Sequence, residues 1–471
     1  MARDGASVPT ARMLLQENEK CASVIRKTRA ARPLVLLHAL EDARMKTRRI
    51  ASLAALALLA ALVSLPVSPA GAGAAWLTES GGADMGLAGA GRTALALDAA
   101  ALAANPASLA GLPGSHLTIA ATPVRLDFEF EGDATSPGQA RNRAGATPAG
   151  SLYASWATGP VTLGFGAYTY AGLGLDYSDG WVGRYVVEDA SLETLNLAFA
   201  LGWRAGERLD LGASVFAQRT AVSGALAIAN SPAWYGPPAD LPDGRVSLDG
   251  TNWSPGGSVG LRYRITDTTR FGLAWTSPVE QDVTLDVRAR DLHPLLETML
   301  PAHSDGHLDT MVPQQVSVGL TQQWGRATTI AAGANWQDWS QFGDAQLRIL
   351  GRSVRMFPEG LRDTWGASVG LRHSFSKGWA ISTGIAYDSS PARGATVPAY
   401  FPVAEQWRAS LGLERQVNRD LDLRVALSLI DQGDARIDHP VSPWPVPGPG
   451  VSGRIGSSRA LVLAVASDFA L

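Results

Sequence analysis

The sequence predicts an all-β fold, a transmembrane antiparallel β-barrel of about fourteen strands plugged by a small N-terminal helical hatch. Three observations point to this fold. After an export signal, apolar and polar residues alternate with period two through most of the chain. Tight turns alternate with long connections along the same region. No stretch after residue 70 reaches the roughly 18 consecutive apolar residues of a membrane helix.

The composition indicates one large repetitive object rather than several ordinary domains. The 471 residues include 50 glycines, and only 18% of them are charged. A formal net charge of -3 without a basic tract argues against nucleic-acid binding. The single cysteine, Cys21, precedes the export signal, so we expect no disulfide or thiolate chemistry in the mature chain. The His and acidic residues show no metal-ligand spacing, and we expect neither a metal nor a cofactor.

Residues 45–74 have the three parts of a secretory signal. A basic start at Met45 is followed by an apolar core over Ile50–Val63 and by a zone of small residues over 66–74. Cleavage after Ala72 or after Ala74 satisfies the small-x-small rule, and the sequence leaves both open.

A membrane anchor is the alternative interpretation of this segment. The short apolar run and the closing Pro66 and Pro69 argue against it. Residues 1–44 precede a complete signal, so we predict that they are an upstream extension absent from the functional protein.

Residues 75–114 form the predicted hatch. The stretch Leu87–Pro113 is rich in Ala and Gly and nearly free of charge. We expect a short helix over Ala94–Ala104, because Ala and Leu are strong helix formers, and a stop at Asn105-Pro106. A poorly ordered linker before the first strand remains the alternative.

Residues 115–471 form the predicted barrel. Leu421 to Leu429 and Val259 to Ile265 show the alternation most clearly, with one face suited to lipid and the other to polar groups. A soluble sandwich would alternate in the same way, but the export signal and the pairing of short turns with long loops favour a membrane barrel. The tight turns are 158–160, 205–207, 266–269, 325–326, 376–378 and 417–420. The longer connections are 132–147, 173–189, 225–251, 290–312, 351–361, 389–404 and 433–458. This alternation implies about fourteen strands with both chain ends on the short-turn side.

Aromatic residues near the expected strand ends suit the girdles at the two membrane interfaces. They are Tyr153, Trp156, Trp203, Trp275, Trp324, Trp365, Trp379 and Trp407.

Several motifs carry a resemblance to a known family. The glycine-rich start over Gly81–Gly91, Asp98 with the alanines after it, and Asn105-Pro106-Ala107 come in order before the first strand. Downstream lie the motifs Gly272–Pro278, Trp336–Phe342 and Tyr387–Pro391. Together they resemble the OmpP1/FadL/TodX family, the FadL-type outer-membrane transporters of long-chain fatty acids and other hydrophobic compounds.

The resemblance implies a fourteen-stranded barrel in the outer membrane of a Gram-negative bacterium, closed by an N-terminal hatch. It implies passive uptake of a hydrophobic ligand that external loops capture, and a kinked third strand that opens the wall sideways. We expect a monomer whose partners are a long-chain fatty acid or similar molecule, outer-membrane lipopolysaccharide and the barrel assembly machinery. A structural or adhesive barrel with a permanently closed hatch remains the alternative.

No catalytic constellation is recognisable, so an enzyme is not expected. An outer-membrane lipid hydrolase, a third hypothesis, would need catalytic residues that the sequence does not show.

Candidate binding residues fall in three regions. Two external loops carry apolar residues that suit a capture groove or, alternatively, a lid in which they pack on one another. These residues are Trp234, Tyr235, Leu292, Leu295, Leu296 and Met299. Asn105-Pro106-Ala107 is expected to anchor the hatch beside the third strand, where Gly164, Gly166 and Gly172 indicate a kink or a wall that admits the hatch.

Two arginines are candidates for a lumenal cation. Arg348 lies on the polar parity of its strand and matches a basic position of the family. Arg219 shares the parity of Leu211 and Val215, so without a bulge it faces lipid, where a central Arg costs about 2–4 kcal/mol. For both arginines, an ordinary lumenal charge in a polar network is the alternative.

Overall fold

The fold is seen in a computed structural model, which describes residues 81–178, 180–230, 241–376, 378–394, 396–442 and 448–471. These residues belong to one compact unit, Val67–Leu471. The predicted extension 1–44, the signal 45–74 and the first hatch residues 75–80 lie outside the described residues, so those assignments stay predictions. Within the described ranges, no helix is long and apolar enough to cross a membrane.

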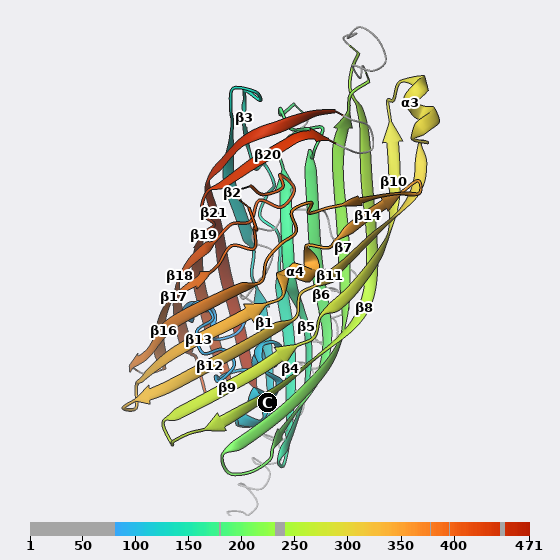
Figure 1. Ribbon diagram of the computed structural model, residues 1–471. Coiled ribbons are helices and arrows are strands. Elements are labelled where there is room, and N and C mark those ends of the chain that lie inside the picture. Colours follow the sequence, from blue (N-terminus) through green and yellow to red (C-terminus); the bar gives the residue numbers. More distant parts are fainter. Residues whose placement is uncertain (1–80, 179, 231–240, 377, 395, 443–447) are drawn as a thin grey trace, which may run out of the picture. The chain divides into compact units, whose positions relative to one another are not determined.

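Fourteen strands pair in sequence and close into a barrel (Figure 1). They are β1 (His116–Ala121), β4 (Gly150–Thr158), β5 (Val161–Asp176), β6 (Asp189–Arg204), β7 (Leu209–Ile228), β8 (Gly244–Arg264), β9 (Thr269–Thr276), β12 (Gln315–Trp324), β13 (Thr328–Gln337), β16 (Thr364–Ser376), β17 (Trp379–Asp388), β18 (Gln406–Gln416), β19 (Leu421–Asp431) and β21 (Gly448–Ala470). Each is antiparallel to its neighbours, and β21 pairs with β1 through Phe469 opposite Leu117. Closure gives hydrogen-bond partners to the backbone N–H and C=O groups that would lack them at an open edge in lipid. The closed sheet confirms the predicted all-β barrel.

The six predicted tight turns all join neighbouring barrel strands. Part of what we predicted as long loops is instead strand. Seven more strands extend the wall on the side away from the tight turns: β2 (Val124–Gly132), β3 (Gln139–Arg141), β10 (Val279–Arg290), β11 (His303–Val312), β14 (Gln346–Ile349), β15 (Arg352–Arg355) and β20 (Ala435–Ser442). The interpretation of 290–312 and 433–458 as loops is therefore wrong in part, because hairpin pairing continues to satisfy backbone groups beyond the lipid.

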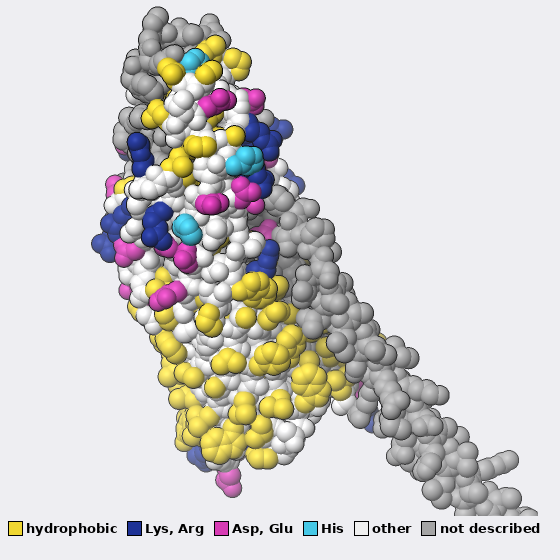
Figure 2. Space-filling view, turned by 90° about the vertical axis from the view of Figure 1, so that its right-hand side faces the viewer, with side chains coloured by type: hydrophobic (Ala, Val, Ile, Leu, Met, Phe, Trp, Pro, Cys, Tyr) yellow, Lys and Arg dark blue, Asp and Glu magenta, His cyan; other side chains and the backbone are white. Residues whose placement is uncertain are grey.

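The outward face of the barrel carries an apolar band between two rows of aromatic side chains. Figure 2 shows apolar side chains gathered on the lower part of one face and charged side chains above them. The row beside the tight turns consists of Trp156, Trp203, Trp324 and Trp379, and the row at the other end contains Trp275, Trp336, Trp365, Tyr387 and Trp407. On β17, Trp379 and Tyr387 are eight residues apart, which spans roughly 20 Å for a tilted strand.

Seven of the eight predicted girdle residues are exposed on this outer face. Tyr153 is the exception. It faces the lumen, is fully buried and stacks on Tyr168, so its assignment to a girdle is wrong.

Residues 81–114 of the hatch lie inside the barrel and contact both β5–β8 and β16–β19 (Figure 1, blue). The hatch contains the 3-10 turn η1 (Met85–Leu87), the helix α2 (Ala101–Ala104) and the 3-10 segment η2 (Pro106–Gly111). The helix ends before Asn105-Pro106 as predicted, but it is shorter than Ala94–Ala104. The side chain of Asp98 bonds backbone amides locally, which competes with helix formation before residue 101.

Candidate functional site

Asn105 joins the hatch to the barrel wall. Its Nδ2 donates to the Thr93 carbonyl at 2.7 Å and to the Leu261 carbonyl of β8 at 3.0 Å. Its Oδ1 accepts from the Ala107 amide at 3.0 Å, at the start of η2. The predicted anchor thus meets the wall at the sixth barrel strand, and its expected place beside the third strand is wrong. The extended backbone of Asn105 leads η2 across β8, β7 and β6 before it reaches β5.

Glycines on the inner wall let the hatch backbone lie directly against the strands. A Cβ at Gly212 of β7 would lie 2.2 Å from the Ala107 nitrogen, and one at Gly384 of β17 would lie 2.1 Å from the Leu87 carbonyl oxygen. Any side chain at these places would displace the hatch. Ten consecutive barrel strands carry such a glycine: Gly164, Gly202, Gly212, Gly260, Gly272, Gly319, Gly333, Gly370, Gly384 and Gly412. We call this set the glycine belt. Of these ten glycines, only Gly164 was predicted from the sequence.

The three glycines predicted on the third strand have different surroundings. A Cβ at Gly164 would meet Leu109 and Leu102 of the hatch, which supports the interpretation that this glycine admits the hatch. Gly166 packs on the ring of Tyr153. Gly172 ends a register shift between β5 and β6 that begins at Thr169.

The shift in β5 is a bulge, as a kinked third strand requires. Thr194 of β6 lies opposite it. The Ala171 amide donates to Thr194 Oγ1 at 2.7 Å, and that hydroxyl donates to the Ala171 carbonyl at 3.2 Å. The hydroxyl therefore fills the gap in the ladder, and the wall is closed at this point.

Apolar side chains fill the lumen above the hatch in three clusters. The lower cluster joins hatch and wall and includes Leu102, Leu109, Leu112, Tyr153, Tyr168, Phe216, Val279 and Val312. The upper cluster lies inside the extended wall and includes Phe128, Phe130, Tyr177, Trp181, Trp339, Phe342, Phe357, Phe401, Ile430 and Ile437. The third cluster packs under α3 (Pro294–Met299) and includes Leu285, Leu292, Leu296, Leu300 and Ile349.

A ladder of neutral amides crosses the inner wall next to the lower cluster. Gln218 donates to Asn196 at 2.9 Å, and Gln281 donates to Gln218 at 3.2 Å. Asn252 extends the ladder to β8 through its bond to Gln281. This part of the lumen is therefore polar without charge.

Neither predicted arginine supplies a lumenal cation. Arg348 of β14 pairs with Asp309 at 2.7 Å and is half exposed, while its neighbour Ile349 is buried in the third cluster. Arg348 therefore lies on the outer face, and its lumenal placement is wrong. The position of Arg348 in the alternation of polar and apolar residues was misleading, because β14 is one of the seven strands that lengthen the wall beyond the membrane. There the outer face is also polar. Arg219 shares the outward parity of Val215 and sits opposite the exposed Trp253, as the regular register requires.

Three arginines are buried on the described barrel strands and were not predicted from the sequence, namely Arg262, Arg408 and Arg424. The most deeply buried of them is Arg408. It lies on β18 on the same face as Ser410 and Gly412, above the glycine belt, and is only 3% exposed. Its partner across the ladder is Ile430 of the upper cluster. Its parity, two and four residues from Ser410 and Gly412, is the sequence signal that could have found it.

The external loop residues are divided between two environments. Leu292 and Leu296 are buried in the third cluster, whereas Leu295 and Met299 of α3 are about half exposed. The lid interpretation therefore fits the first pair, and a capture surface fits the second. Trp234 and Tyr235 lie outside the described residues, so a groove between the two loops stays a prediction.

The other side of the hatch meets the wall through charged side chains. Asp98 is 2% exposed and accepts hydrogen bonds from the amides of Ala83 (2.8 Å) and Ala100 (3.1 Å). It also accepts from Nη1 of Arg424 on β19 at 2.9 Å. Burial raises the pKa of Asp98 to about 6, against the lowering effect of the Arg424 guanidinium.

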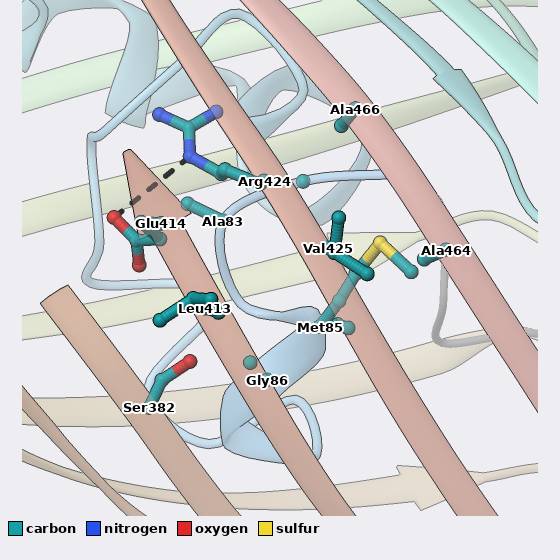
Figure 3. A pocket seen from close by; sticks show the side chains of 13 residues that line it. Ala83, Met85, Gly86, Ser382, Leu413, Glu414, Arg424, Val425, Ala464 and Ala466 are labelled. Carbon is teal, nitrogen blue, oxygen red and sulfur yellow. Dashed lines mark ion pairs between the residues drawn. The ribbon is translucent and has the colours of Figure 1, made fainter. Parts of the chain in front are cut away.

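Two further wall residues extend this contact. Arg424 lies 3.9 Å from Glu414 of β18, and Arg372 of β16 donates to Glu414 at 2.8 Å. These side chains form one charged cluster between hatch and wall, which consists of Asp98, Arg424, Glu414 and Arg372. A small cavity lies beside it, between η1 and β17–β21 (Figure 3). Met85 of the hatch packs there on Ala426 and Ala464.

Groups that could hold a metal ion are not found in the part of the chain that the structure describes. No three His, Cys, Asp or Glu side chains gather there as metal ligands. The candidate site consists of a closed wall, a tightly packed hatch and apolar clusters above the hatch.

Residues 63–468 match the family described as outer membrane protein transport protein (OMPP1/FadL/TodX). The chain belongs to this family. It is therefore an outer-membrane protein of a Gram-negative bacterium, in a family of transport proteins rather than enzymes.

Curated relatives share about a quarter of their residues with this member of the OMPP1/FadL/TodX family. The long-chain fatty acid transport protein of Escherichia coli O6:H1 is 25% identical over 384 residues, which cover 75% of this chain and 85% of the relative. Outer membrane protein P1 of Haemophilus influenzae is 25% identical over 385 residues, covering 70% and 80%.

Solved structures of the family share the fold. A Pseudomonas aeruginosa FadL homologue superposes with a TM-score of 0.74 at 21% identity and covers 84% of this chain and all of its own. The Pseudomonas putida toluene transporter TodX superposes with a TM-score of 0.64 at 18% identity and covers 86% and 99%.

Proposed function

We propose that this protein carries long-chain fatty acids or similar hydrophobic molecules passively into the cell across the outer membrane. The observation that carries the proposal is the arrangement of apolar lumenal clusters directly above a hatch that fills the barrel. The names of the relatives, which include transport proteins for fatty acids and for toluene, support this substrate class.

Capture begins at the outside of the barrel. The exposed side chains of Leu295 and Met299 offer an apolar surface at the tip of α3. Beneath them, the third cluster continues inward along β10 through Leu285 and Val283. A hydrophobic ligand that settles on α3 thus has apolar contacts along its way into the lumen.

The lumen binds the ligand chiefly by its apolar part. Each methylene that leaves water contributes about 0.8 kcal/mol, so a long acyl chain binds well with few polar contacts. Arg408 at the edge of the upper cluster replaces Arg348 as the proposed partner of a carboxylate. Release follows either past the hatch or sideways through the wall at the bulge of β5, which Thr194 keeps closed in the resting protein.

Uptake of a labelled long-chain fatty acid by cells with and without the gene tests the proposal. We expect uptake to require the gene and to saturate as the fatty acid concentration rises. Uptake of labelled toluene in the same cells distinguishes the two ligand classes. A barrel with normal membrane insertion and no uptake of either ligand would favour the structural or adhesive alternative, with a permanently closed hatch.

A further inference from the structure

The hatch is fixed to the wall by different contacts on its two sides. On the β5–β8 side, Leu109 packs against Gly164 and Gly202, and Asn105 bonds the Leu261 carbonyl. Arg204 of β6 adds a bond of 2.6 Å to the Ala110 carbonyl. These contacts are apolar packing and hydrogen bonds. Arg262 of β8 also bonds the Ala94 carbonyl of the hatch at 2.9 Å, and its charge is paired with Asp210 of β7, another wall residue. Separating hatch and wall here would expose apolar surface and break hydrogen bonds, but it would leave the Arg262–Asp210 ion pair intact.

On the β16–β21 side, a buried ion pair joins the hatch to the wall, between Asp98 and Arg424. Arg424 is 9% exposed at its side chain, and its Nε has no hydrogen-bond partner among the described residues. Oδ1 of Asp422 on the same strand also lacks one there. Buried charged groups are costly unless every donor and acceptor is satisfied, so water that reached this side would stabilise them. The raised pKa of Asp98 has the same physical cause.

The small cavity marks the same side. It lies between hatch residues Ala83, Met85 and Gly86 and wall residues that include Leu413 and Arg424 (Figure 3). A gap thus remains on this side, next to the close contacts that Gly384 and Gly412 of the wall make with Leu87 and Gly86. On the hatch side the lining consists of small residues and the flexible thioether of Met85, which can change rotamer at low cost.

We propose that the hatch opens along the seam between residues Gly82–Leu87 and strands β16–β19, where Asp98 and Arg424 part, while the half from Asn105 to Leu112 stays attached to β5–β8. We call this contact the hatch seam. Opening it rehydrates the Asp98 and Arg424 charges and joins the cavity to the lumen above. Asp98 is the positioning residue of the seam, because it binds both Ala83 of the moving segment and Arg424 of the wall. The inference rests on the proposed transport function.

Two matched cysteine pairs test which side moves. Leu87→Cys with Gly370→Cys crosses the hatch seam, with a Cβ to Cβ separation of 3.1 Å. Leu109→Cys with Gly202→Cys crosses the attached side, with a separation of 3.0 Å. Disulfides have Cβ separations of about 3.5–4.5 Å, and a Cβ at either glycine would come within 3.0 Å of a hatch backbone atom, so both pairs require a similar displacement of the hatch. Both leucines are fully buried, and the chain's only native cysteine is Cys21, before the predicted signal.

Fatty acid uptake and single-channel conductance are measured for both proteins, oxidised and reduced. We expect oxidation of the seam pair to abolish uptake and open events, with recovery on reduction, and oxidation of the attached-side pair to leave both unchanged. Loss with the attached-side pair, loss with both pairs or loss with neither would each overturn the inference. Absent uptake with the unsubstituted protein would instead refute the transport function, and conductance would still report on the seam.

A second cysteine pair across the seam controls for misfolding caused by the glycine replacements. Met85→Cys with Ala426→Cys of β19 joins two side chains of one buried cluster across the seam and replaces no glycine. It is expected to behave as the first seam pair does, and unchanged conductance after its oxidation would contradict the inference.

Discussion

Asn105 of the hatch and Gly260 of β8 lie so close that a Cβ on the glycine would be 2.1 Å from Asn105 Oδ1. The missing side chain lets Asn105 reach the next carbonyl of the same strand, at Leu261. One small residue on the wall and one amide on the hatch thus fix the height at which the hatch sits in the barrel.

Replacing Asn105 with Ala should loosen the hatch without unfolding the barrel. The change removes three hydrogen bonds, two donated to Thr93 and Leu261 and one accepted from Ala107, with a cost of about 2–4 kcal/mol in total. Arg92 is the only Lys or Arg in residues 75–114, so trypsin cleavage at that bond reports exposure of the hatch. We expect faster cleavage in the variant, with heat-dependent gel migration unchanged because the barrel stays folded.

Asn252→Ala is the matched control for this experiment. Asn252 also faces the inner wall, but its side chain bonds Ser254 and Gln281 rather than the hatch. Its loss should leave cleavage at Arg92 unaltered. Equal cleavage rates in the two variants would mean that Asn105 does not anchor the hatch.

Local patterns in the sequence were sufficient for the barrel. Strict period-two alternation gave the outward face of Arg219, and turn residues gave all six short connections. Proline restricts the residue before it, which placed the helix end at Asn105. Each of these depends on a few neighbouring residues.

Features that depend on register across strands were not predictable from the residues alone. The glycine belt is visible only when strands are aligned, for example when Gly202, Gly212 and Gly260 fall opposite one another. Arg348 has the expected parity, but its strand pairs with β11 outside the membrane band, where polar side chains also face outward. Alternate positions along a strand share one face of the sheet. Only the pairing with neighbouring strands shows whether that face lies toward the lumen, the lipid or the solvent.

Arg408 and Arg348 should differ in their effect on ligand binding. Arg408→Ala removes a buried lumenal cation, so binding of a fatty acid should weaken while that of a neutral alkane of equal length hardly changes. Arg348→Ala removes a half-exposed ion pair on the outer face and should affect neither ligand. Binding titrations with both ligands check this, and equal losses for both ligands in Arg408→Ala would assign Arg408 to structure.

Acidification should stabilise the closed hatch. Burial raises the pKa of Asp98 from an ordinary 3.8 to about 6 in the closed form, which therefore binds the proton more tightly than an open, hydrated form does. The stabilisation is fully present below pH 3.8 and is lost as the pH rises through about 6. It amounts to at most about 3 kcal/mol. Open events in planar bilayers should become rarer as the pH falls from 7 to 4.

Asp98→Asn isolates this effect from other titrating groups. Asp84 and Asp468 also act on Asp98, and they remain in the variant. The variant should lose the dependence of opening on pH between 4 and 7. A pH dependence that persists in Asp98→Asn would have to come from another group.

Deleting residues 86–112 should turn the closed barrel into an open pore for small hydrophilic solutes. The segment contributes Leu87, Thr93, Asn105 and Ala107, whose atoms lie directly on the glycine belt, so its removal leaves that level of the lumen without its filling. The wall itself is a closed sheet whose strands pair independently of the hatch, and the variant should keep its heat-dependent gel migration. Single-channel conductance in planar bilayers gives the answer, because an unfilled lumen conducts ions and a plugged one does not. A conductance that stays near zero after the deletion would mean that other residues close the barrel, and the role given to this hatch would be wrong.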